Sequence, residues 1–122
     1  MSRETINVAQ TRTIDATPAN VIIRSMEPNS AMTMRYSAVA RSTGNVVKAW
    51  NGVRTVQRAG TAAPSPVGAA IAPNIDPSTG APTWSVAAGA SGNSVILTLT
   101  GAAGTTIDWD ISIDAVVNVL PV

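Results

Sequence analysis

The sequence predicts an all-β fold, either a single antiparallel β-sandwich or a small β-barrel, with a long Pro/Ala-rich loop or arm. Several stretches alternate apolar and polar residues at a period of two, which is the pattern of a strand with one buried face. Turn-forming residues separate these stretches, and no stretch combines helical periodicity with a cap at each end. The 122 residues are a usual length for one domain, so we expect a single β domain over residues 1–122.

The clearest strand is residues 105–119, where one parity is apolar from Ile107 to Val119 and the other carries aspartates. Residues 95–100 predict a second strand. The glycine-bearing connection 101–104 predicts that these two strands form an antiparallel hairpin at the centre of the core. The same reasoning predicts four earlier strands, at residues 4–14, 20–26, 31–41 and 45–58.

Residues 59–82 interrupt this pattern because they hold five of the eight prolines. Proline lacks the amide that a central strand donates to its neighbour, so this segment is not a central strand. Two alternatives remain open: a surface loop, or an extended arm along a neighbouring subunit. Ile71 and Ile75 favour the arm, since a free loop would leave both side chains in water, and they are candidate partner-contact residues.

The N-terminal segment 1–14 also has two interpretations. It alternates Ile6 and Val8 with polar neighbours, which fits the first strand of the domain's own sheet. It fits equally an arm that adds a strand to a partner's sheet. In such an arm Ile6 and Val8 would set the register, while Arg3 and Arg12 would pair with carboxylates of the partner. These four residues are therefore candidate contact residues.

The composition argues against an enzyme. The chain has no His, no Cys and a single lysine, Lys48, which removes the usual general bases, thiol nucleophiles and zinc ligands. Asp108 and Asp110 share one strand face, and a solvated outer face explains them better than a calcium or catalytic site does. We expect no catalytic residue, no metal and no cofactor. No stretch is apolar enough to span a membrane, and the N-terminus lacks a signal peptide, so no membrane partner is expected.

The charges are distributed unevenly along the chain. All eight basic residues lie at or before Arg58, and four of the seven acids lie after it. The arginines occur singly along strands rather than in a cluster, which is not typical of a nucleic-acid interface. We therefore expect the two halves of the chain to pair with each other, within one chain or between chains, and we expect no nucleic-acid partner.

The three tryptophans have different predicted places. Trp109 shares the apolar parity of its strand and is a predicted core residue. Trp84 opens a strand after the Pro-rich segment and is expected to anchor its end. Both parities around Trp50 are mixed, so Trp50 is either a core residue or a partner-contact residue. Met26, Met32 and Met34 are expected to fill gaps in a core that has no phenylalanine.

Three stretches share a pattern with a known family. Ser91–Trp109 reads SGNSVILTLTGAAGTTIDW, and the upstream stretches Met34–Arg41 and Ala49–Gly52 read MRYSAVAR and AWNG, followed by Arg54 and Arg58. Together they resemble a small β module of virion proteins from tailed bacteriophages and prophages. The resemblance covers about residues 33–118, and its motifs are structural. The Pro-rich segment departs from the module.

This resemblance implies a structural protein of the virion. Because the chain begins at Met1 and holds little besides the module, with no fibre shaft, we expect a capsid decoration (cement) protein bound in many copies to the outer shell. Its expected partners are the major capsid protein or another virion protein, and its own subunits, with a trimer favoured. It would be made in the cytoplasm of the bacterial host. The alternative is a tail or fibre component, including a receptor-binding tip; a carbohydrate-binding β-sandwich is less favoured because aromatic residues are few.

Overall fold

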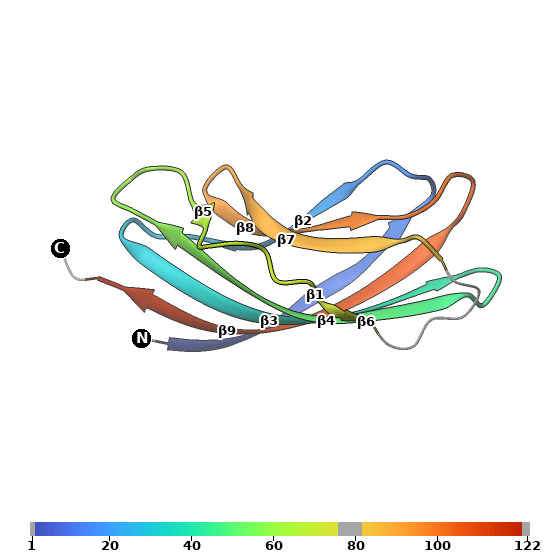
Figure 1. Cartoon of the computed structure of the whole chain (residues 1–122), viewed down its shortest axis with the longest axis horizontal. Helices are drawn as coiled ribbons and strands as arrows, with labels where there is room; N and C mark the ends of the chain where they lie inside the picture. Colours follow the sequence, from blue (N-terminus) through green and yellow to red (C-terminus); the bar gives the residue numbers. More distant parts are fainter. Residues whose placement is uncertain (1, 76–81, 121–122) are drawn as a thin grey trace.

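Two antiparallel β-sheets pack face to face in the computed structural model, which describes residues 2–75 and 82–120 (Figure 1). The large sheet has the strand order β1-β9-β3-β4, and the short strands β5 and β6 both pair with β4; the small sheet has the order β2-β8-β7. The strands are β1 (Ser2–Thr13), β2 (Ala19–Ser25), β3 (Ser30–Ser42), β4 (Val47–Arg58), β5 (Ser65–Pro66), β6 (Asn74–Ile75), β7 (Ser85–Ser91), β8 (Ser94–Thr100) and β9 (Ile107–Val119). The predicted all-β fold is confirmed, in its open sandwich form.

The strands that the alternation predicts are present, with bounds that differ by a few residues. β3 follows the period of two along its whole length: Met34 and Tyr36 are buried, while Arg35 and Ser37 between them are exposed. The strand expected after Trp84 is β7, which begins at the next residue. Hydrophobic periodicity therefore located β1, β2, β3, β4, β8 and β9, but it did not indicate the short strands β5 and β6 of the Pro-rich segment.

The predicted hairpin between residues 95–100 and 105–119 is wrong. β8 lies in the small sheet between β2 and β7, whereas β9 lies in the large sheet between β1 and β3. Their connection crosses from one sheet to the other, beside the connection from β1 to β2. A Cβ atom at Gly101 would lie 2.8 Å from Thr13 Oγ1 and 3.1 Å from the carbonyl oxygen of Asp15. The glycine therefore allows these two crossings to approach closely, which is a different role from a hairpin turn.

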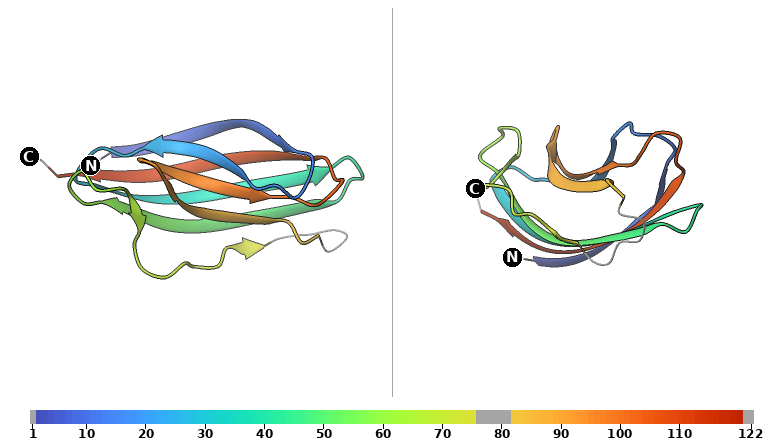
Figure 2. Two further views of the ribbon diagram at one scale, coloured as in Figure 1. Left: turned by 90° about the horizontal axis from the view of Figure 1, so that it is seen from above. Right: turned by 45° about the vertical axis from the view of Figure 1, so that its right-hand side comes forward.

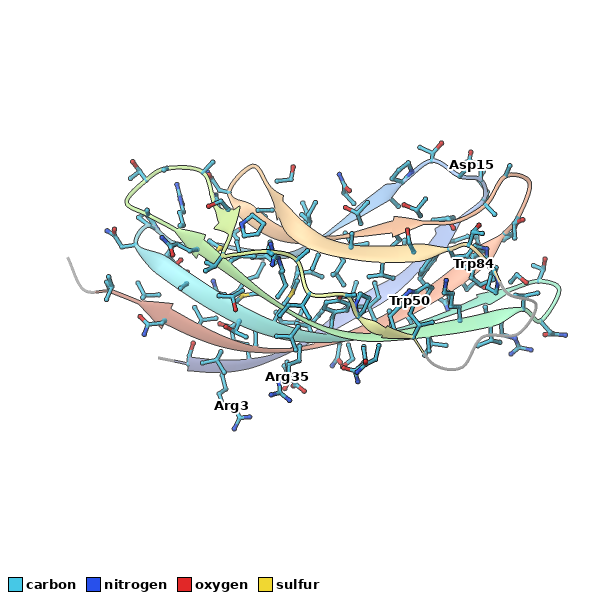
Figure 3. The ribbon with its side chains drawn as sticks, viewed as in Figure 1. Arg3, Asp15, Arg35, Trp50 and Trp84 are labelled. Atoms are coloured by element: carbon cyan, nitrogen blue, oxygen red, sulfur yellow. The ribbon has the colours of Figure 1, made fainter. Side chains whose placement is uncertain are left out.

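The three tryptophans of the chain meet at one end of the core. The rings of Trp109 and Trp50 are stacked with their centroids 5.4 Å apart, and the Trp84 ring is tilted against Trp109 at 6.4 Å. On β3, Ala38 lies opposite Trp50 and Ala40 lies opposite Trp109, so small residues leave room for the rings. Figure 3 labels Trp50 and Trp84 between the two sheets. The prediction of Trp109 in the core is confirmed, and Trp84, which was expected to anchor the end of its strand, is buried directly before β7.

The rest of the core along β3 contains methionines and one tyrosine in place of tryptophans. Met32 and Met34 are fully buried there, as the sequence predicts. Tyr36 follows them on the same strand face and lies over Gly52 of β4, its partner in the sheet register. A Cβ atom at Gly52 would overlap the Tyr36 ring. A large residue on one strand is therefore accommodated by glycine on the next.

Candidate functional site

The outer face of the large sheet carries charged side chains of both signs. Alternate residues of β1, β9 and β3 point to this face. Its charged members are Arg3, Arg12, Arg35, Arg41, Asp108, Asp110 and Asp114. Figure 3 shows the labelled side chains of Arg3 and Arg35 extending away from the sheet. The face is open to water, as expected for the two aspartates that the sequence singles out.

An ion pair joins the two neighbouring strands β1 and β9 on this face. Arg12 donates from Nε to Asp108 Oδ1 at 2.8 Å and from a second nitrogen to Oδ2 at 3.3 Å. These hydrogen bonds lower the pKa of the Asp108 carboxyl and raise the pKa of the Arg12 guanidinium. The expected pairing of the basic half with the acidic half is thus confirmed for this pair, within one chain.

The three aspartates of β9 do not gather into a metal site. Asp110 accepts a hydrogen bond from Gln10 at 3.3 Å, and Asp114 accepts one from Thr5 at 3.2 Å. With Asp108 paired to an arginine, each aspartate has its own partner on β1. Among the described residues, no group of three or more potential ligands lies close enough to hold a metal ion.

β1 is an edge strand of the chain's own large sheet. It pairs antiparallel with β9 in two runs, from Ser2 to Val8 and from Thr11 to Thr13. Of the two interpretations of residues 1–14, the first-strand interpretation therefore holds. Ile6 and Val8 are half-buried against the core and are not free for a partner. The other two candidates on this segment, both arginines, lie on the opposite, solvated face.

Arg24 ties the two sheets together along the side where β1 and β2 lie. It donates to both carboxylate oxygens of Glu4 at 2.8 and 2.9 Å, and to those of Glu27 at 2.9 and 3.3 Å. The hydrogen bonds from Arg24 lower the pKa of both carboxyls. The guanidinium is largely shielded from water, with 19% of its side chain exposed. One arginine thereby fastens β1 of the large sheet to β2 of the small sheet.

We name residues 59–75 the strap, because they run in extended form along the edge of β4 (Figure 2). β5 pairs with Val56 and Gln57, and β6 pairs with Trp50 and Asn51. The strap is extended, as in the predicted arm, but it pairs with its own chain. The rest of the predicted segment, residues 76–81, lies outside the described residues.

Two arginines of β4 anchor the strap through its backbone. Arg54 donates to the carbonyl oxygens of Ala69 at 2.8 Å and Gly68 at 3.1 Å, and Arg58 donates to that of Ala62 at 3.0 Å. Arg54 is 9% exposed, and its Nε atom is buried without a hydrogen-bond partner. Carbonyl dipoles thus surround this charge, and no ion pair to it occurs among the described residues.

Sequence reasoning missed the role of Arg54, although a signal was present. Arg54 shares its strand parity with Trp50, Gly52 and Val56, all of which are buried. An arginine on the apolar parity of a strand needs a local acceptor for its donors. The Pro-rich segment that follows β4 supplies those acceptors, since the carbonyl groups of Gly68 and Ala69 lie between β5 and β6.

The strap exposes the isoleucines that the sequence singles out. Ile71 is 66% exposed and Ile75 is 54% exposed. An apolar hollow of about 270 Å³ lies where the strap faces Tyr36, Val53 and Val86. The strap therefore exposes two isoleucine side chains to solvent beside an apolar hollow.

Trp50 is not available to a partner. It is 3% exposed, stacked on Trp109 and covered by the Lys48 ammonium, which lies 5.5 Å from its ring centroid. Of the two predicted places for Trp50, the core is the one found in the structure. Trp50 is therefore not a partner-contact residue. The seven candidate contact residues thus fall into three places, the solvated face, the core and the strap, and do not form one site.

The fold and these surfaces define an open β-sandwich that offers faces and edges for contact. No known protein family matches the chain, and a comparison with curated proteins finds no match either. In the part of the chain that the structure describes, no helix is long and apolar enough to cross a membrane.

Proposed function

We propose that this chain is a structural protein of a bacteriophage virion, a decoration or cement protein that binds in many copies to the outside of the capsid shell. Its role is adhesion without catalysis, and its partner is the major capsid protein or another virion protein. The observation that carries the proposal is the sequence resemblance to a phage virion module over about residues 33–118.

The positions of the resembling residues support this proposal. Leu97, Leu99, Ile107 and Trp109 of the C-terminal stretch are fully buried. The upstream stretch around Tyr36 belongs to the same core. The shared motifs are therefore those that specify the sandwich, so the resemblance is one of folding pattern.

The strap supplies a surface suited to adhesion. Ile71 and Ile75 are exposed on a segment that is held at both ends, by β5 and by β6. A pre-ordered segment loses little conformational freedom when it binds, which favours affinity for a given contact area. We propose that this surface contacts the shell.

The alternative is a tail or fibre component, and the same sandwich would serve there. A carbohydrate-binding function is less supported, because all four aromatic side chains, three tryptophans and Tyr36, are buried in the core. Sugar recognition by stacking needs an aromatic ring on the surface.

The number of copies per particle tests the proposal. Purified protein is mixed with particles that lack it, and the bound copies are counted by quantitative gel analysis and cryo-electron microscopy. Hundreds of copies on the shell support decoration, about a dozen at the tail support the alternative, and no binding to any particle contradicts both.

A matched pair of variants tests the contact surface. The double variant Ile71→Ser/Ile75→Ser should weaken particle binding, because it removes the exposed apolar side chains of the strap. Ile22→Ser is the control, since Ile22 is as exposed, at 69%, but lies on the small sheet. Equal binding by both variants would exclude the strap as the shell contact.

A further inference from the structure

The sandwich has four strand edges, β1 and β4 in the large sheet and β2 and β7 in the small sheet. An edge strand exposes unpaired backbone groups on which another strand can pair, and proteins usually block such edges with bulges, charges, prolines or a covering segment. Comparing the four edges shows which one is open to a partner.

Three of the edges are blocked. β1 has a register shift between Val8 and Thr11 and carries three charged residues. β2 has a register shift between Ile22 and Arg24, and its arginine is turned to Glu4 and the neighbouring loop. β4 is covered by the strap. Bulges and covers of this kind prevent unwanted strand pairing.

β7 has no bulge, and the strap lies beside it across the apolar hollow without pairing with it in the described part of the chain. β7 pairs with β8 in an uninterrupted register from Ser85 to Ser91, and its sequence SVAAGAS contains no charge and no proline. The outer face of the small sheet is also uncharged. Its members, on the three strands, are Asn20, Ile22, Ser25, Ser85, Ala87, Gly89, Ser91, Ser94, Ile96, Thr98 and Thr100.

The register shows which backbone groups of β7 point outward. Ser91 and Ser94 flank a two-residue turn in which Gly92 has a φ of +58°, as in a type II′ hairpin. The residues that flank such a turn exchange hydrogen bonds, and hydrogen-bonded and non-hydrogen-bonded pairs then alternate along the strands. The amide and carbonyl groups of Val86, Ala88 and Ala90 therefore point away from β8.

Among the described residues, no backbone hydrogen bond from outside the small sheet reaches these outward groups. Ala88 and Ala90 are half-buried and Val86 is buried, with side chains on the core side of the sheet. The edge is therefore seven residues long and uninterrupted in register, has no strand partner other than β8 within residues 2–75 and 82–120, and carries small side chains.

We propose that β7 is a contact between two copies of this chain, paired antiparallel with the same strand of a second copy about Ala88. The strand is nearly symmetric about that residue. In the pairing, serine meets serine at both ends, Val86 meets Ala90, Ala87 meets Gly89, and Ala88 meets itself. All the outward backbone groups then face one another, and the two small sheets become one continuous sheet.

A second copy fits this edge better than an unrelated strand does, because the self-pairing brings together small, uncharged residues and buries no charge. The contact has two-fold symmetry, unlike the three-fold association that the resemblance implies. It does not depend on the proposed virion function, since it concerns the protein free in solution.

The mass of the protein in solution tests this contact. Ala88→Pro removes an amide that points outward, so the β7–β8 pairing is kept while the pairing to a second copy loses one hydrogen bond from each copy. The control is Ala9→Pro, the same substitution at the bulge of the blocked edge β1, where Ala9 is exposed and has no register partner.

In sedimentation equilibrium over a range of concentrations, the parent protein and Ala9→Pro should form dimers. Ala88→Pro should raise the dimer dissociation constant at least about tenfold. If Ala88→Pro does not fold, Ala87→Lys replaces it. This variant puts a charge on the outer face of β7 without removing a backbone amide, and it should also raise the dimer dissociation constant. A parent protein that stays monomeric, or an oligomer that neither β7 variant weakens, overturns the proposal.

Discussion

The two sheets of the sandwich share one core but differ in what they offer to the outside. The large sheet has four long strands of 12 or 13 residues, a charged outer face, and two blocked edges. The small sheet has three strands of seven residues, an uncharged outer face, and one open edge. Charge and edge blocking keep a surface in water, so the difference indicates that the large sheet's outer face is suited to solvent and that the edge β7 of the small sheet is suited to pairing with a second copy.

The largest expected effect is a loss of stability on mutation of the shared core, compared with a mutation on the outer face of the small sheet. Trp109→Ala removes a fully buried ring that stacks on Trp50 and leaves its hydrogen-bond partner Thr13 unsatisfied. The free energy of unfolding should fall by about 3–5 kcal/mol, measured by denaturant unfolding. Ile22→Ala, at an exposed position of the small sheet, is the control and should change it by no more than about 0.5 kcal/mol. Equal unfolding midpoints for Trp109→Ala and the parent would contradict the core assignment.

A second pair of variants compares one glycine from each sheet. Gly52→Ala in β4 places a methyl group where the Tyr36 ring lies, so the free energy of unfolding should fall by about 1–3 kcal/mol. Gly89→Ala in β7 meets no atom within 4 Å and should be close to neutral. Thermal or denaturant unfolding of both variants tests this prediction. A neutral Gly52→Ala would mean that β3 and β4 do not pack as closely as described.

The third effect is smaller and depends on pH. The pKa values of Glu4 and Glu27 are lowered below their ordinary value of 4.5 by hydrogen bonds from Arg24. A carboxyl with a lowered pKa in the fold stabilises the protein above its unfolded pKa, and this contribution is lost as the pH falls through the folded pKa.

Arg24→Met should therefore cost about 1 kcal/mol or less at neutral pH, because both carboxyls stay partly open to water. Its stability should also fall less steeply than that of the parent as the pH decreases below about 4.5. Denaturant midpoints measured across this pH range test both statements. Parallel curves for parent and variant would show that Arg24 does not hold the two sheets together.

The strands were predictable from the sequence because their alternation has one physical cause, a buried face and a solvated face. β9 is the clearest example, since Ile107, Trp109 and Ile113 are all fully buried. The same pattern arises whichever neighbour a strand pairs with. Alternation therefore could not show that β8 and β9 belong to different sheets, and the glycine-bearing connection between them fits a crossing as well as a turn.

The surfaces were less predictable than the strands. Arg54 holds the strap on its own chain by hydrogen bonds to carbonyl groups of the strap. The sequence of the Pro-rich segment does not indicate that Arg54 binds it. Trp50 could not be assigned because its neighbours alternate weakly, and only the stacking with Trp109 places it in the core. β7 is identified as the open edge by comparison with the blocking features of the other three edges. Those features depend on how the strands pair, which local sequence does not show.

Amide hydrogen exchange at two protein concentrations tests the difference between the two sheets most directly. Ala88 and Ala90 have outward-pointing amides on β7, so their exchange should slow markedly as the concentration rises and copies associate. The amides of the blocked edge β1 should exchange at the same rates at both concentrations. If the Ala88 and Ala90 amides exchange equally fast at both concentrations, or if the β1 amides are the ones that become protected, β7 is not the open edge and the small sheet is not the contact sheet.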